Sequence, residues 1–509
     1  KASGSLLDVE GQEETSLFFR PKVDFSKTFK ENQGWKVGFY GEREKNERRS
    51  IATDTILNAS FFYDLVKVYA QSPETKTLTL GAFYSRRFDY FPRTENFSKT
   101  TVADEMNIQG GWRPSAASNL RWNLTYRDLK VTNDDLTNER PQQTYLGRLE
   151  YLFNVKKGFL RGNTVYELGA GQEKKIEFTY LEVNPGEGVY TWIDRNEDGI
   201  KQLDEFEIAV FQDEADHIRV STFTDEFIRS NNVQFSQSLS FNPVRLWRKD
   251  KGIKGFLAKF STQSSLKIAR KTVDNAGVQA WNPFQLSVAD TSLLSVSSNI
   301  RNTLFFNRIN PKYGFEIGMS DNQNRVILTS GYEDRERSEQ FLKFRWNISK
   351  KIGTSINFGL GTRENDSEFF NTKDYNIRFY RVAPQVTLLF NKNFRTILKY
   401  EFLDNKNQIG NFETALSHDF SAELTYNKIS KTEIRANFSF VDVAYIGDNG
   451  TPVEFAILQG LQNGSNYLWN LIVERRIAKN VLMNISYEGR QTGESRVIHV
   501  GRASVRATF

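Results

Sequence analysis

The sequence predicts an all-β chain, a large transmembrane antiparallel β-barrel of about 22 strands or slightly more. Three observations predict it. Apolar and polar residues alternate along the whole chain, and short turns alternate with long polar loops. No apolar run approaches the roughly 18 residues that a membrane helix needs. Aromatic residues, which favour strands, reach 14% of the chain. Because only helices and closed barrels satisfy their backbone groups in lipid, the barrel is the remaining membrane fold.

The alternation has a period of two, as in strands with one apolar face. Clear runs lie at 17–25, 120–126, 256–260, 342–348 and 434–440. Together with the residues on either side of them, these runs are about as long as a tilted strand needs to cross a bilayer, roughly 9–11 residues. If the apolar positions face lipid, the charged positions between them face the lumen. This set comprises Arg121, Arg127, Lys259, Lys267, Arg345, Arg395, Lys399, Glu401, Glu423, Glu433 and Arg435.

The connections between the runs alternate in length. Short turns are expected at 154–158, 307–312, 349–351, 391–393, 427–431 and 477–480. Long polar loops are expected at 42–58, 127–142, 271–291, 321–340, 362–375, 404–414 and 442–466. This two-ended pattern is typical of the bacterial outer membrane, where the long loops are extracellular.

The strand count also makes a prediction about the N-terminus. The first expected strand, 16–29, runs towards the short-turn end, which leaves Lys1 at the long-loop end. Bacterial single-chain barrels have even strand numbers and both ends in the periplasm. We therefore expect a further strand or an upstream region before Lys1; a miscounted hairpin within 171–254 is the alternative. The expected organisation is barrel strands over 1–183, an extracellular insertion over 184–232, and barrel strands over 233–509.

The insertion contains a calcium-loop motif. Residues 194–205 match D-x-N-x-D-G-x5-E in full, the twelve-residue loop of the EF-hand. A hard cation prefers six to eight oxygens, and alternate positions of a tight loop converge on one point. The predicted Ca²⁺ ligands are Asp194, Asn196, Asp198, Ile200 through its carbonyl, Gln202 and Glu205. We expect a strand over 189–193 before the loop and a helix after it, with a structural role for the metal. The alternative is a polar turn that binds nothing.

The C-terminal residues carry a second motif. Gly501, Ala503, Val505, Ala507 and Phe509 occupy alternate positions up to the terminal Phe. This resembles the C-terminal insertion signal of bacterial outer-membrane proteins. The resemblance implies that barrel-assembly machinery recognises the last strand and that outer-membrane lipid surrounds it. If Phe509 faces lipid, the alternation places Arg502, Ser504, Arg506 and Thr508 towards the lumen.

Composition and histidine positions limit the other function classes. There is no Cys, which excludes disulfides and thiol chemistry, and the net charge of +6 is spread along the chain, so no nucleic-acid partner is expected. The three His residues lie far apart in sequence. A Ser–His arrangement of the outer-membrane phospholipase kind would need His499 beside Ser486 or Ser504. We therefore expect no enzyme.

The block at 190–207 looks like blocks in large surface-exposed proteins of Bacteroidota. Barrels of that phylum often belong to multi-protein complexes, which include SusC-type nutrient importers, the type IX secretion translocon and barrel-assembly complexes. The resemblance implies a subunit of an outer-membrane assembly or secretion complex, with other outer-membrane or surface proteins as partners. A transporter or receptor of the TonB-dependent kind, or a pore, is the alternative, although no plug or TonB-contact segment is visible before the first strand. Loop aromatics either contact a partner or pack against each other: Trp281, Phe284, Phe369, Phe370, Tyr445 and Phe455.

Overall fold

The computed structural model describes residues 1–29, 34–73, 75, 77–273, 281–284, 293–328, 331–368, 370–429 and 431–507. It divides into two compact units. Unit 1 comprises residues 1–174, 226–239 and 267–294, and unit 2 comprises 175–225, 240–266 and 295–509. No helix in the described ranges is long and apolar enough to cross a membrane.

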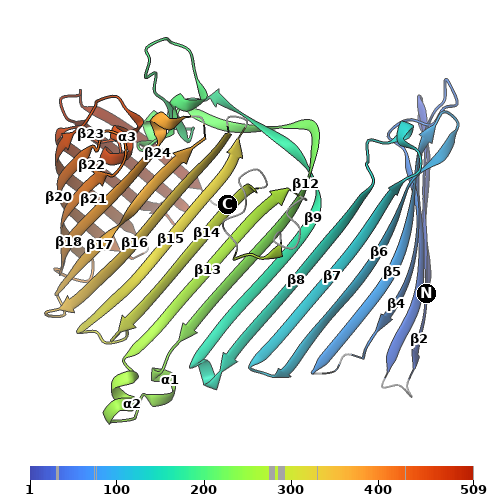
Figure 1. Ribbon diagram of the computed structural model, residues 1–509, viewed down its shortest axis with the longest axis horizontal. Helices are drawn as coiled ribbons and strands as arrows, with labels where there is room; N and C mark the ends of the chain where they lie inside the picture. Colours follow the sequence, from blue (N-terminus) through green and yellow to red (C-terminus); the bar gives the residue numbers. More distant parts are fainter. Residues whose placement is uncertain are drawn as a thin grey trace. The chain divides into compact units, whose positions relative to one another are not determined.

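The described residues form 24 strands, of which β10 and β11 are three-residue strands of an insertion and the other 22 are long wall strands. The predicted all-β antiparallel barrel class and the predicted strand number are therefore confirmed. Consecutive strands of each unit pair side by side in chain order (Figure 1).

The strands that lie wholly in unit 1 are β1 (Ala2–Glu10), β2 (Glu14–Phe29), β3 (Trp35–Ser50), β4 (Phe61–Gln71), β5 (Leu78–Arg93), β6 (Asn96–Ser115), β7 (Ser118–Val131) and β8 (Gln142–Val155). Single 3-10 turns, η2 (Asp134–Leu136) and η3 (Lys156–Gly158), lie in two connections. Four long strands have residues in both units: β9 (Leu160–Glu182), β12 (His217–Phe241), β13 (Phe260–Val273) and β14 (Leu293–Phe306).

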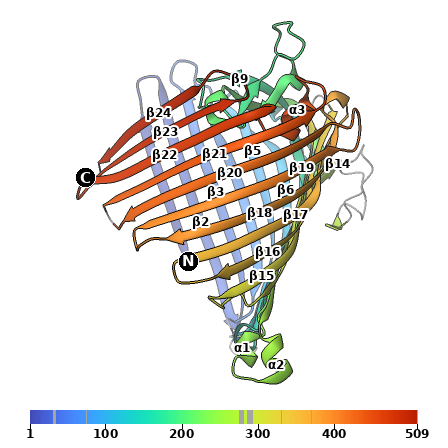
Figure 2. The same cartoon turned by 90° about the vertical axis from the view of Figure 1, so that its left-hand side faces the viewer.

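Unit 2 continues with β15 (Tyr313–Leu328), β16 (Gly331–Asn347), β17 (Ile352–Ser367), β18 (Tyr375–Leu389), β19 (Phe394–Asn407), β20 (Thr414–Lys428), β21 (Thr432–Ile446), β22 (Gly464–Ala478), β23 (Val481–Thr492) and β24 (Ile498–Ala507). Figure 2 shows β15 to β24 as one series of neighbouring strands. The helices of this unit are α1 (Val244–Trp247), α2 (Gly252–Leu257) and α3 (Pro452–Leu458).

The strand β1 corrects the expected topology at the N-terminus. It pairs antiparallel with β2, from Ala2 opposite Val23 to Glu10 opposite Thr15, and was missed because the run 2–10 has no clear alternation. It adds the strand that the even count required. With β1, the number of long strands in the described residues is even.

The unit 2 sheet has an apolar face and a polar face, as the alternation predicts. Directly opposed residues share a face, and the pairs Phe344–Ile356, Val386–Leu398 and Ala422–Phe438 continue one row across β16 to β21. The apolar face is defined by Leu342, Phe344, Trp346, Ile352, Ile356, Phe358, Leu360, Val382, Val386, Leu398, Phe420, Leu424, Ile434, Phe438 and Phe440. Many of these side chains are exposed, Phe420 by 52% and Phe438 by 48%.

The opposite, polar face of unit 2 carries the members of the predicted lumen set that lie in β16 to β21: Arg345, Arg395, Lys399, Glu401, Glu423, Glu433 and Arg435. Arg121, Arg127 and Lys267 belong to unit 1. Members of the unit 2 set pair with each other across or along the strands: Arg395 with Glu423 at 3.1 Å, and Lys399 with Glu401 at 2.7 Å. Lys259 is an exception, because residues 252–257 form α2 and Lys259 lies in the connection to β13. The predicted strand start at Phe256 is therefore wrong: the apolar residues there follow a helical turn.

The predicted loops are partly strand. The short turns occur where expected, but β15 continues to Leu328 and β16 begins at Gly331, inside the expected loop 321–340. The same extension shortens the loops after β3, β7, β17 and β19. The ladder of backbone hydrogen bonds continues beyond the apolar belt, where both faces become polar and the alternation that marks a strand disappears. Cross-strand contacts such as Gln323 to Asp334 at 3.0 Å occupy these polar faces.

Candidate functional site

The insertion occupies residues 183–216, between the end of β9 at Glu182 and the start of β12 at His217. The predicted span 184–232 is therefore too long, because residues 217–232 belong to β12. Within the insertion, β10 (Tyr190–Trp192) and β11 (Phe206–Ile208) form a hairpin in which Trp192 opposes Phe206. Phe206 is buried and stacks on Tyr180 with a centroid distance of 4.0 Å. The expected helix after the loop is wrong; a single 3-10 turn, η4 (Leu203–Glu205), leads directly into β11.

The loop between β10 and β11 is the predicted calcium loop. The backbone N–H of Gly199 donates to Asp194 Oδ2 at 2.9 Å, and the N–H of Ile200 donates to Asp198 Oδ1 at 2.7 Å. Gly199 has a φ of +71°, a left-handed conformation that favours glycine. Glu205, the last loop residue, is 3% exposed and accepts from Trp192 Nε1 at 2.8 Å. The loop is thus a compact turn closed by its own carboxylates.

The fit of this loop to a metal is partial. Asp194 Oδ1 is buried and has no hydrogen-bond partner, which suits a ligand atom. Asp198 Oδ2, however, accepts from Asn196 Nδ2 at 2.9 Å and from Gln202 Nε2 at 2.8 Å. Among the described residues, no three His, Cys, Asp or Glu side chains lie close enough to hold a metal ion; the side chain of Asp204 is not described. The oxygen-bearing residues of the loop follow the order of the EF-hand motif in the sequence, and calcium binding stays a prediction.

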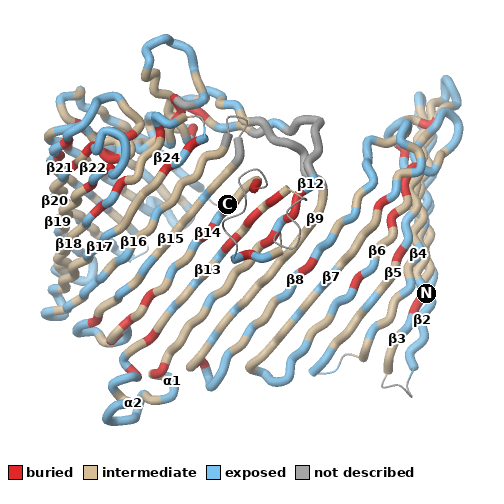
Figure 3. The backbone as a smooth tube through the Cα atoms, viewed as in Figure 1, coloured by how far each residue is buried: buried red, intermediate tan, exposed pale blue. Residues whose placement is uncertain are grey.

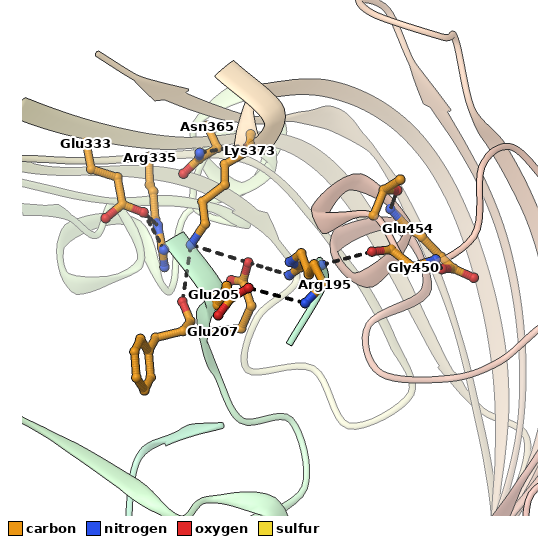
Figure 4. Close-up of polar contacts among 11 residues, drawn as sticks. Arg195, Glu205, Glu207, Glu333, Arg335, Asn365, Lys373, Gly450 and Glu454 are labelled. Carbon is orange, nitrogen blue, oxygen red and sulfur yellow. Dashed lines mark hydrogen bonds and ion pairs between the residues drawn. The ribbon is translucent and has the colours of Figure 1, made fainter. Parts of the chain in front are cut away.

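Two cations, Lys373 and Arg195, fix the insertion and its calcium loop within unit 2 (Figure 4). Lys373, in η8 (Asn371–Lys373) before β18, donates to the carbonyl of Phe206 at 3.2 Å and lies 3.6 Å from Glu207. Arg195 pairs with Glu207 at 3.0 Å and also donates to the carbonyl of Gly450 at 3.4 Å. Burial lowers the pKa of Lys373, against the opposing effect of Glu207. Burial therefore disfavours the charged form of Lys373, and the nearby carboxylate of Glu207 favours it.

A second anchor joins the far end of the insertion to β23. The Arg490 guanidinium pairs with Asp213 and Glu214 and lies 4.1 Å from the ring centroid of Phe211. Its side chain is only 7% exposed. Below this anchor, a cavity of about 570 Å³ lies against the polar face, lined by Phe211, Lys399, Asn437 and Arg490 among others. The insertion therefore forms one wall of a cavity on the polar face.

Helix α3 covers the same face at the long-loop end. Thr451 caps it by accepting from the N–H of Glu454 at 3.0 Å. Its buried residues form a hydrophobic core with polar-face positions of β18, β20 and β21: Ile377, Ala415, Val441, Val443, Tyr445, Val453, Ile457 and Leu458. Arg363 donates to the carbonyl of Ala456 at 3.2 Å, near the negative end of the helix. Figure 3 shows buried positions of β21 and β22 near this end of the strands.

Several of the loop aromatics pack within the chain. Tyr445 lies in the α3 core, and its hydroxyl donates to the carbonyl of Asp448 at 3.1 Å. Trp281 packs edge-on against Tyr145, and Phe284 against Phe235, all within unit 1. Phe369 lies outside the described residues.

The histidine arrangement gives no support to hydrolysis. The Tyr487 hydroxyl and His499 Nδ1 are 2.9 Å apart, and the register places His499 opposite Gly489 on the face of Tyr487. Ser486 and Ser504 occupy the intervening positions, which point to the opposite face. The Ser–His pairing considered from the sequence is therefore wrong.

The C-terminal strand β24 has the predicted faces. Gly501, Ala503, Val505 and Ala507 oppose Tyr487, Ile485, Met483 and Val481 of β23. Val505 is 66% exposed on this apolar face. Phe509 lies outside the described residues. Recognition of this strand by assembly machinery stays a prediction.

Comparisons with known proteins found no matching family model and no matching curated protein. Among solved structures, the chain is similar to the FrpB iron transporter from Neisseria meningitidis, with 9% identity, a TM-score of 0.39 and coverage of 100% of this chain and 80% of that one. It is also similar to the siderophore receptor PiuA from Acinetobacter baumannii, with 10% identity, a TM-score of 0.35 and coverage of 99% and 81%. The ferric-catecholate import receptor Fiu from E. coli K12 shows 9% identity, a TM-score of 0.34 and coverage of 96% and 76%. The printed names of these three structures are those of a transporter and two receptors, the class that the sequence analysis gave as its alternative.

Proposed function

We propose that this chain is an integral outer-membrane β-barrel that works as a transporter or receptor, with its own folded segments covering the luminal face of unit 2. The membrane assignment rests on the apolar face. Its exposed Leu, Ile and Phe side chains run without a charged residue across β16 to β21. Monomeric soluble proteins rarely expose apolar patches larger than a few hundred Å². Contact with lipid removes the unfavourable exposure of these apolar side chains to water, and the alternate residues of each strand then face the lumen.

The observation that carries the function is the packing of α3 and the insertion on the luminal face of unit 2. An open pore needs a solvated lumen at its mouth. Here the α3 core and the Arg490 anchor occupy that face instead. A cavity of about 570 Å³ lies below the anchor, against the same face. A covered cavity suits a protein that binds a ligand before passing it on, and this use is non-enzymatic.

The predicted calcium is part of the same proposal. A cation between Asp194 and Glu205 would neutralise carboxylates that otherwise repel, and would stiffen the turn that carries Arg195. The buried, unpartnered Asp194 Oδ1 supports it. Glu205 is followed directly by Phe206 and Glu207, which contact Lys373. A metal here would have a structural role, holding the insertion against the wall.

The expected partners belong to the proposal as well. They are outer-membrane lipid around the apolar face, barrel-assembly machinery at the C-terminal strand, and other outer-membrane or surface proteins of a Bacteroidota-type cell. The resemblance of 190–207 and the terminal motif support them.

Conductance in planar lipid bilayers tests whether the segments that cover the luminal face of unit 2 restrict passage through the barrel. Wild-type protein should stay mostly closed, whereas replacement of residues 184–215 by a short Gly/Ser linker should give large, stepwise currents. The matched control is the same replacement in the unit 1 loop 134–139, which contacts neither α3 nor the Arg490 anchor in the described contacts and should leave the currents unchanged. Large open currents from the wild type, equal to those of the shortened variant, would contradict the proposal.

A further inference from the structure

A second, smaller cavity lies within unit 2 beneath the insertion hairpin, separate from the cavity below Arg490. Its volume is about 150 Å³. It is bounded by the insertion, by β9 and β12, and by the polar face of β15, β16 and β17. An engineered protein cavity of about 150 Å³ holds one benzene ring. The space therefore suits a ligand with a single six-membered ring.

Aromatic rings form part of the walls of this cavity. Six of its lining residues are Phe178, Tyr180, Tyr190, Phe206, Tyr332 and Phe370. Tyr180 is stacked on Phe206 and meets Tyr190 edge-on at 5.1 Å. Rings fixed in this way offer flat apolar surfaces and favour stacked or edge-on contact with another ring.

The charged residues at the cavity have a positive excess. Arg219, Arg335 and Lys373 line it, against one lining carboxylate, Glu333. Glu333 pairs with Arg335 at 2.5 Å, and Lys373 pairs with Glu207, which lies outside the lining. Arg219 has no ion pair with a described residue; its guanidinium lies 4.9 Å from the ring centroid of Phe178 and 5.8 Å from that of Tyr190. Arg219 is exposed, so it stands at the solvent side of the rings.

We propose that this cavity binds a small aromatic carboxylate, with its ring between the aromatic walls and its carboxylate on Arg219. A guanidinium forms two parallel hydrogen bonds with a carboxylate, so Arg219 can hold this group at the solvent side of the rings. Lys373 and Arg335 add positive potential on the inner side. The inference assigns a ligand site that does not depend on transport through the barrel.

Calorimetric titration of the purified full chain in detergent, with benzoate as the probe, tests the site. Benzoate should bind with a stoichiometry of one. Benzyl alcohol, which has the ring without the charge, and inorganic phosphate, which has the charge without the ring, should each bind at least about tenfold more weakly, since a hydrogen bond to a charged group is worth about that factor.

Two variants test whether benzoate binds in this cavity. Arg219→Gln should weaken benzoate binding by about tenfold or more. Val326→Trp, at a lining position of β15, should fill the cavity and abolish binding even where the charges remain. The matched control is Arg378→Gln, which removes an exposed guanidinium 5.1 Å from the Tyr380 ring, outside the cavity, and should bind benzoate like the wild type. Absence of benzoate binding in the millimolar range, equal binding of benzyl alcohol or phosphate, or equal effects of Arg219→Gln and Arg378→Gln would overturn the proposal.

Discussion

The Arg490 anchor predicts how firmly the insertion is held. Arg490→Leu removes the guanidinium and leaves Asp213 and Glu214 without their cation. Removing one partner of a fully buried ion pair costs about 3–5 kcal/mol, whereas exposed pairs are worth about 0–1 kcal/mol. The side chains of Arg490, Asp213 and Glu214 are 7%, 23% and 43% exposed, so this anchor lies between the two limits. We expect a loss of about 2 kcal/mol, which raises the detached population of the insertion about 30-fold.

Hydrogen exchange of the β10–β11 hairpin measures that population directly. Exchange there should accelerate in Arg490→Leu while the strands of the wall stay protected. The control is Arg435→Leu, because Arg435 pairs with Glu433 on the same face at 2.5 Å, but with side chains 55% and 30% exposed and away from the insertion. Unchanged hairpin exchange in Arg490→Leu, or the same acceleration in Arg435→Leu, would refute the anchoring role.

Three further predictions concern the wall, the metal and pH. Phe438→Arg should slow membrane insertion, since Arg at the bilayer midplane costs about 2–4 kcal/mol, whereas Asn437→Arg on the luminal face should be tolerated. Equal heat-modifiable gel migration of the two variants would contradict the assignment of these residues to the lipid-facing and luminal faces. Chelation of calcium should make the insertion protease-sensitive while the barrel stays folded. The double variant Asp194→Ala and Asp198→Ala should show the same sensitivity in the presence of calcium. If the rate of cleavage does not change with chelator, the loop is a polar turn that binds no calcium. The pKa of Lys373 is lowered from its ordinary 10.5, so the docked state binds fewer protons than the free one and docking should strengthen as pH rises through the folded pKa towards 10.5. Lys373→Met should abolish this pH dependence of insertion proteolysis, and an unchanged profile would count against it.

Periodicity predicted most of the wall because one face of each strand is apolar. Alternation at 434–440 placed Phe438 and Arg435 on opposite faces, and the register agrees. It failed where both faces are polar, as at 321–340, because the backbone ladder continues without an apolar signal. It also failed at 2–10, where no alternation marks β1.

The candidate site was predictable only in part. The spacing of Asp194, Asp198 and Glu205 located the loop, because turn chemistry is local in sequence. The anchors were not predictable, since Arg490 lies more than 270 positions from Asp213 and Glu214. In the sequence, Arg490 has the same pattern as any other charged residue on the luminal face, because its contact with the insertion forms only in the folded chain. The α3 core was hidden for the same reason, as 452–458 is a short apolar stretch within a loop.

The orientation of the chain in the membrane tests the central proposal most directly. The protein has no Cys, so a single introduced Cys gives an unambiguous label. Asn449→Cys lies in the exposed loop beside α3, and Lys392→Cys lies in the exposed short turn between β18 and β19. On intact cells, an impermeant maleimide should label Asn449→Cys and leave Lys392→Cys unlabelled until the outer membrane is permeabilised. Labelling of Lys392→Cys alone, or equal labelling of both on intact cells, would contradict an outer-membrane barrel in which α3 and the long loops face outward.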